Sequence, residues 1–159
     1  MNRVLSCLVL LFFVTAACVS CSRRPKLERP DGLPKLHPCS VTVTFGGHAM
    51  EGILVTLIPE DGSKWQPNAT TDNEGTATPN ASFGFKGAPA GKYTVAFTYV
   101  TDNPDYDERN PKSRRFLSLI PLKYGRDQST EKLEIKAGEK NRFSYELEAG
   151  EEFVLPPKK

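Results

Sequence analysis

Apolar and polar residues alternate along several segments of the chain. In residues 39–45, 53–57 and 93–99 every second side chain is apolar, and residues 132–136 and 143–148 repeat the pattern near the C-terminal end. A period of two places successive side chains on opposite faces of an extended chain. Each segment therefore predicts a β-strand with one buried face and one exposed face.

Turn-forming residues separate these segments. Gly46–Gly47 and residues 60–62, 72–75 and 87–92 carry the glycine, proline, asparagine and aspartate that reverse turns require. Residues 137–141 predict a hairpin loop that joins the last two strands to one another.

Two weaker strand segments, residues 66–71 and 76–85, complete the pattern. The result is an all-β fold, an antiparallel β-sandwich of about seven strands of the immunoglobulin-like or prealbumin-like kind. After the N-terminal region, no segment spaces its apolar residues as a helix would over more than two turns, so we expect almost no helix.

The N-terminal region has the pattern of an export signal. Arg3 precedes the apolar stretch 8–17, and small residues lead up to Cys18. This ending resembles the lipobox of bacterial lipoproteins, in which the cysteine receives lipid, although Thr15 departs from the usual leucine. Cys18 is the expected lipidation site, and Cys21 is the alternative.

A competing interpretation is an uncleaved membrane-spanning helix. The uncharged residues between Arg3 and Arg23 reach the lower length limit for such a span. Arg23 and Arg24 would then lie on the exported side, against the usual bias of basic residues toward the cytoplasm. The export signal is therefore favoured.

These features divide the chain into four parts. We expect a signal peptide at residues 1–17, a flexible tether rich in charge and proline at 18–37, the β-sandwich at 38–148 and a tail at 149–159. The protein would then be exported and held by lipid to a bacterial membrane, on its periplasmic or cell-surface side.

Charge and composition limit the kinds of function that the chain can have. The 21 Lys and Arg residues nearly balance the 19 Asp and Glu residues, which argues against a nucleic-acid partner. The two histidines, His37 and His48, are expected in solvated loops, and there is no CxxC motif or Cys/His cluster. We therefore expect no enzyme activity, no cofactor and no metal site, with Cys39 a small buried residue.

Two stretches carry a family resemblance, and together they cover most of residues 38–148. They are similar to the carboxypeptidase regulatory-like, transthyretin-like domain of small exported bacterial lipoproteins. The resemblance implies a sandwich fold and a place in the cell envelope, and it implies no particular chemistry. The matching residues are 38–43, 46–52, 55–59, 71–75 and 87–95 in the first stretch, and 120–124 and 129–130 in the second.

The sequence offers a short set of candidate binding residues. The long polar loop after residue 101 contains Asp102, Asp105, Tyr106 and Asp107, and its length makes it the best candidate for a recognition surface. Its oxygens could hold calcium, but the spacing does not match an EF-hand and basic residues follow closely, so a solvated charged loop is favoured. Trp65 is either a platform for a sugar ring or a half-buried cap at a sheet edge. The leading hypothesis is a non-catalytic domain that binds an envelope protein or a polysaccharide, or contributes structure. A carbohydrate-binding module and an unrecognised envelope hydrolase are the alternatives.

Overall fold

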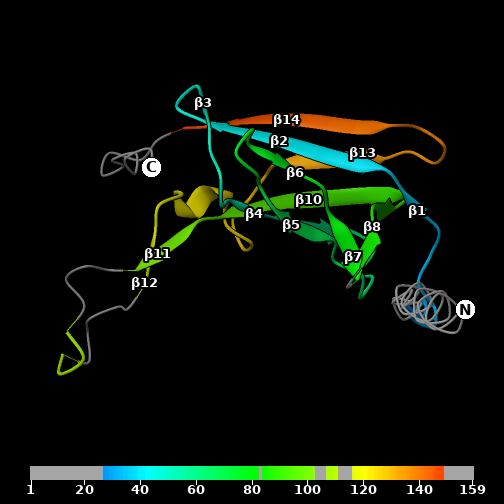
Figure 1. Ribbon diagram of the computed structural model, residues 1–159, viewed down its shortest axis with the longest axis horizontal. Helices are drawn as coiled ribbons and strands as arrows, with labels where there is room; N and C mark the ends of the chain where they lie inside the picture. The colour runs from blue at the N-terminus through cyan, green and yellow to red at the C-terminus, as the bar shows by residue number, and fades with distance from the viewer. Residues whose placement is uncertain (1–26, 83, 103–106, 111–115, 149–159) are drawn as a thin grey trace, which may run out of the picture.

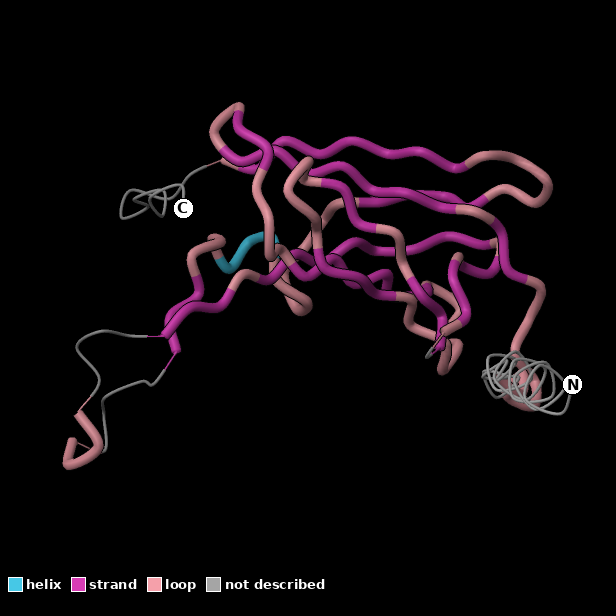
Figure 2. Tube along the Cα trace, viewed as in Figure 1, coloured by secondary structure: helices cyan, strands magenta, loops and turns pink. Residues whose placement is uncertain are grey.

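The computed structural model describes residues 27–82, 84–102, 107–110 and 116–148. Within these ranges the chain is built almost entirely of β-strands, and its helical content is one turn of 3-10 helix, η1 (Leu122–Tyr124) (Figure 2). None of the helical structure described is long and apolar enough to cross a bilayer. The expected all-β fold is confirmed.

The strands form two main sheets that pack face to face (Figure 1). The first sheet is antiparallel throughout, in the order β13 (Lys132–Ile135), β10 (Gly91–Thr98), β4 (Leu54–Pro59), β5 (Asn68–Thr70), β7 (Asn80–Ser82) and β8 (Phe85–Lys86). The second sheet has the order β14 (Asn141–Leu147), β2 (Cys39–Phe45) and β3 (His48–Ala49), with β6 (Thr76–Ala77) also paired to β2.

Two small ladders extend the sandwich. They are β1 (Leu36–His37) with β9 (Ala88–Pro89), and β11 (Val100–Asp102) with β12 (Phe116–Ser118).

The core lies between the two main sheets, where the alternation predicts it. The odd-numbered residues of β2 are all buried, from Cys39 to Phe45, and Val55 and Leu57 of β4 oppose them from the other sheet. Phe97 of β10 completes this layer. The polar residues between them face outward, so the period of two translates directly into the two layers.

The hairpin predicted at residues 137–141 is wrong. β13 pairs with β10 in the first sheet, whereas β14 crosses to the second sheet and runs parallel to β2. The Asn141 side chain fixes this crossing, because its amide nitrogen donates to the carbonyl oxygens of Pro38 and Lys136 at 3.2 and 3.1 Å. Alternation identifies the face of a strand, but it does not identify the partner strand.

The single strand predicted at residues 76–85 is also divided. Pro79 interrupts it, since proline has no N–H group to donate to a ladder. β6 before Pro79 pairs with β2 of the second sheet, and β7 after it pairs with β5 of the first. The chain therefore changes sheets at this proline.

The packed chain begins before residue 38, inside the segment expected to be a tether. Leu33 is buried, and β1 pairs with β9. Gly87 has a positive φ of 105°, and a Cβ there would lie 2.5 Å from the carbonyl oxygen of His37. The glycine at position 87 thus allows β1 and the segment before β9 to approach one another this closely.

Strand β10 separates the two small ladders along the length of the molecule. β9 ends just before β10 begins, and β11 begins just after β10 ends. The eight residues of β10 cover about 25 Å. Figure 1 shows β1 near one end of the longest axis and β11 with β12 near the other.

Candidate functional site

A shallow groove lies where β1 crosses the end of the sandwich. It encloses a volume of about 640 Å³ and is lined by the chain around Pro34–His37, the turn after β4, and the start of β10. Lys35 and Lys92 lie in its walls together with Glu60 and Asp61. Because both signs of charge are present, the groove has no strong electrostatic preference for an anion or a cation.

His37 lies in the groove wall and is buried, so the solvated loop expected for it is wrong. Its Nδ1 accepts a hydrogen bond from the backbone N–H of Gly138 at 3.2 Å. Nδ1 thus acts as the acceptor that ties β1 to the loop around Gly138. His48, the other histidine, is exposed in β3. The two histidines therefore do not form a ligand pair.

Tyr93 closes the floor of the groove. Its hydroxyl donates to the carbonyl oxygen of Pro89 at 2.9 Å. Burial, with the negative charge of Asp61 as a smaller cause, raises the pKa of Tyr93 to about 12. A phenol with this pKa stays protonated at neutral pH and serves as a structural hydrogen-bond donor.

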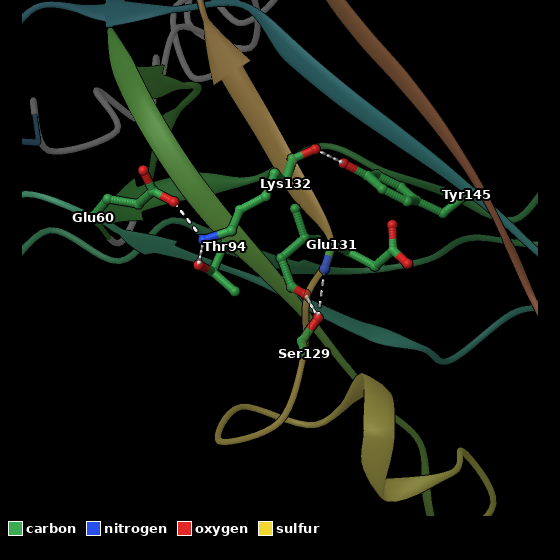
Figure 3. A network of polar contacts seen from close by, with 7 residues as sticks. Glu60, Thr94, Ser129, Glu131, Lys132 and Tyr145 are labelled. Carbon is green, nitrogen blue, oxygen red and sulfur yellow. Dashed lines mark hydrogen bonds and ion pairs between the residues drawn. The ribbon is translucent and has the colours of Figure 1, made fainter.

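A polar network runs along the outer face of the first sheet, beside the groove (Figure 3). The Lys132 ammonium lies 2.5 Å from a carboxylate oxygen of Glu60 and 3.0 Å from the Thr94 hydroxyl. The Ser129 hydroxyl donates to the Val95 carbonyl oxygen at 2.5 Å. These side chains link the segments around β4, β10 and β13. Within the described residues, Ser129 has no histidine partner that would activate its hydroxyl.

Cys39 behaves as expected from the sequence. It is the first residue of β2, is 4% exposed and forms no disulfide within the described residues. Burial raises the pKa of its thiol to about 11. A thiol with this pKa is neutral and unreactive at physiological pH.

Trp65 is half-buried, in agreement with the interpretation as a cap at a sheet edge. Its Nε1 donates to the carbonyl oxygen of Gly32 at 3.2 Å, and the Lys64 ammonium lies 4.9 Å from the centre of its ring. The indole thus fastens residues 27–37 to the sandwich. Because Lys64 lies over the ring, Trp65 is not a bare platform.

The predicted binding residues do not form one site. Trp65 follows the end of β4 that pairs with the start of β10, whereas Asp102 lies in β11, beyond the other end of β10. Asp107 is exposed, and its carboxylate accepts from the backbone N–H of Arg109 at 2.9 Å. Asp105 and Tyr106 lie outside the described residues, as do Cys18 and Cys21. In the described ranges no three His, Cys, Asp or Glu side chains gather as metal ligands.

The end of the sandwich around β11 has a feature that the alternating pattern does not predict. The described part of the chain has four exposed large hydrophobic residues, and three of them lie at this end: Leu54, Val100 and Leu122, which are 38%, 52% and 73% exposed. Leu54 pairs with Thr98 at the end of β10, Val100 begins β11, and η1 contains Leu122. Val100 and Leu122 lie outside the segments that alternate clearly, and this position is the one indication of their exposure in the sequence.

Comparisons with known proteins add little information about this chain. No family model matches the chain, and no curated protein matches it. A crystal structure described as a "putative adhesin" from Bacteroides ovatus aligns at 14% identity with a TM-score of 0.43, over 79% of this chain and 49% of that one. The chain thus spans about half the length of that structure. The resemblance to the carboxypeptidase regulatory-like domain stays a prediction.

Proposed function

We propose that this chain is an exported, lipid-anchored protein of the cell envelope, whose β-sandwich binds another macromolecule or contributes structure and performs no catalysis. The observation that carries the proposal is that side chains able to act in catalysis are hydrogen-bonded to the backbone instead. In the groove beside β1, His37 and Tyr93 direct polar atoms to backbone groups. Such bonds hold strands together and leave these groups poorly placed to act on a substrate.

The positions of β1 and β11 at opposite ends of the sandwich support an anchor at the β1 end and a binding surface at the β11 end. The described chain starts beside β1, and the exposed residues Leu54, Val100 and Leu122 lie at the opposite end. Fully extended, the chain between Cys18 and Leu33 reaches at most about 50 Å. A lipid on Cys18 would therefore keep the β1 end within about 50 Å of the bilayer and leave the β11 end free to meet a partner.

The exposed hydrophobic residues support this end as the binding surface. An apolar group that faces solvent gains free energy when a partner covers it. An envelope protein or a polysaccharide with apolar sugar faces would provide such a cover. The nearly balanced charge of the chain does not favour a nucleic acid as the partner.

The anchor is tested by labelling cells with a fatty-acid analogue. We expect label on the wild-type protein and its loss in Cys18→Ser, with Cys21→Ser retaining it. Cys7→Ser is the control, because this residue lies within the predicted signal. Label that persists in both Cys18→Ser and Cys21→Ser would refute lipid attachment at these cysteines.

The binding surface is tested separately, with purified full-length protein and envelope fragments from cells that make it. Leu122→Lys should reduce cosedimentation with the fragments several-fold. Leu27→Lys is the matched control, because Leu27 is 48% exposed and lies at the β1 end. Equal cosedimentation of both variants with wild type would contradict a binding role for the β11 end.

A further inference from the structure

Strand β14 leaves one edge of the second sheet open. It is the outermost strand in the order β14-β2-β3, and its only ladder partner in the described chain is β2. With seven residues it is the longest such edge described, because the outer strands β13 and β8 of the first sheet have four and two residues. An open edge presents unpaired N–H and C=O groups that another strand can join.

The backbone of β14 shows which residues face this edge. The N–H of Asn141 donates to the carbonyl oxygen of Pro38, and the carbonyl oxygen of Leu147 accepts from Gly46, so the odd-numbered residues bond toward β2. Successive residues of a strand direct their backbone groups to opposite sides. The backbone groups of Arg142, Ser144 and Glu146 therefore point to the open edge.

The sequence of this edge is complementary to itself. In an antiparallel pair of β14 strands centred on Ser144, Arg142 lies opposite the partner's Glu146, and Glu146 lies opposite the partner's Arg142. On the other face, Phe143 lies opposite the partner's Tyr145. Opposite charges and aromatic rings are both favourable cross-strand pairs.

Other antiparallel registers that keep the same backbone groups facing one another are worse. A shift of the partner copy by two residues breaks both pairs of Arg142 with Glu146 and places Ser144 opposite Arg142 or Glu146. A shift by four residues brings Arg142 opposite Arg142 of the partner copy, or Glu146 opposite Glu146. Both shifts also shorten the ladder. Charges of a single sign would protect the edge by repelling a second copy, whereas the two signs on either side of Ser144 attract one.

We infer that two copies of this chain associate through β14, antiparallel about a two-fold axis at Ser144, so that their second sheets become one continuous sheet. Each copy contributes the same seven residues, as two-fold symmetry requires. The side chains of Arg142, Ser144 and Glu146 are exposed and need no rearrangement to meet the second copy. An edge of one strand makes a small interface, so the dimer is weak and depends on concentration.

Sedimentation velocity of the full chain in density-matched detergent tests this dimer. Wild type should shift from monomer to dimer as concentration rises. Arg142→Glu and Glu146→Arg should each weaken association by about tenfold, because each variant replaces two attractive pairs with two repulsive ones. The double variant should restore it, since the charges are then only exchanged.

A cysteine placed on the two-fold axis tests the register. In the inferred pair the two Ser144 Cα atoms are about 5.5 Å apart, within the range of a disulfide. Ser144→Cys should therefore give a peptide linked at position 144 to itself after mild oxidation and digestion, identified by mass spectrometry. In Arg142→Cys the two positions are about 14 Å apart along the ladder, too far to link.

Three results would overturn the inference. They are a wild type that stays monomeric at every concentration, single charge variants that dimerise as well as wild type, and the absence of a link at position 144. Circular dichroism of each variant confirms that the sandwich is intact. Loss of the lipid anchor does not enter these measurements, so the dimer and the proposed envelope function fail independently.

Discussion

The Tyr145 hydroxyl donates a hydrogen bond to the carbonyl oxygen of Lys132 at 2.9 Å. This bond joins β14 of the second sheet to β13 of the first, at the side of the sandwich where the two sheets meet (Figure 3). The Tyr145 ring also packs edge-on against Phe97, with ring centres 5.3 Å apart. One side chain thus links the two layers through both a polar and an aromatic contact.

Tyr145→Phe separates these two contributions. The ring keeps its contact with Phe97, and only the bond to Lys132 is lost. We expect the free energy of unfolding to fall by about 0.5–1.5 kcal/mol, the usual net value of one hydrogen bond. Urea denaturation measures the change. Thr42→Val, which removes a partly buried hydroxyl bond to Thr76 at 3.1 Å, is a comparison on the same sheet. A Tyr145→Phe protein as stable as wild type would show that the bond contributes nothing.

Alkaline pH should destabilise the protein through its buried acids. The pKa of Cys39 is raised to about 11 by burial, and the pKa values of Tyr93 and Tyr145 are raised to about 12 by burial first and nearby negative charge second. A pKa that is higher in the folded state favours folding of the neutral form. This stability is complete below the unfolded pKa and is lost as pH rises through the folded one.

Cys39→Ala isolates the thiol's share of this effect. At neutral pH the variant should be less stable than wild type, because it leaves a small cavity. Between about pH 9 and 11 the difference in stability between the two proteins should shrink. Over this range the exposed thiol of the unfolded wild type ionises, which stabilises its unfolded state, and the variant has no thiol at this position. Urea midpoints of both proteins over this range provide the measurement. A difference that stays constant from pH 7 to pH 11 would contradict the role assigned to burial of Cys39.

The sequence predicts the faces of the strands better than their partners. Val41 and Val43 alternate with threonines, and this pattern follows from burial on one side alone. Leu133 and Phe143 show the same alternation, yet their strands belong to different sheets. The parallel pairing of Phe143 with Val41 joins positions far apart in the chain, and no local signal encodes it.

The candidate site was harder to predict for a related reason. His37 stands beside a proline in a charged segment, which is typical of a loop. Its burial depends on Gly138, which donates a backbone hydrogen bond, and on Gly87, which lets β1 approach. Both glycines resemble ordinary turn residues in the sequence. Contacts made by backbone groups of distant residues leave no pattern near the side chain that they bury.

Asn141→Ala tests the crossing between the sheets. The Asn141 side chain is buried, accepts from the N–H of Lys136 at 2.8 Å and donates to carbonyl oxygens of Pro38, Lys136 and Glu139. Alanine removes all four contacts and leaves the backbone groups of a tight loop without partners. We expect the free energy of unfolding to fall by about 2–4 kcal/mol.

Chemical denaturation compares Asn141→Ala with Asn141→Asp. Aspartate retains the oxygen that accepts from Lys136 but removes the amide donors, so it should also destabilise the protein at neutral pH. If aspartate were tolerated as well as asparagine, the donated bonds would not be what holds the crossing.

Gly87→Ala tests whether the close approach of β9 is what holds β1 on the sandwich. The new methyl group would lie 2.5 Å from the carbonyl oxygen of His37, and the φ of 105° is itself unfavourable for alanine. Because β1 is a short edge segment, we expect it to detach before the core unfolds. Trypsin should then cut after Lys35 several-fold faster than in wild type.

Gly138→Ala is the matched control for this experiment. Gly138 also has a positive φ, of 81°, but nothing lies within 4 Å of the position that its Cβ would take. The backbone strain is therefore present without the collision, and cleavage after Lys35 should increase much less. Equal rates of cleavage in the two variants would mean that strain alone releases β1, and that contact between Gly87 and His37 is not what positions the groove wall.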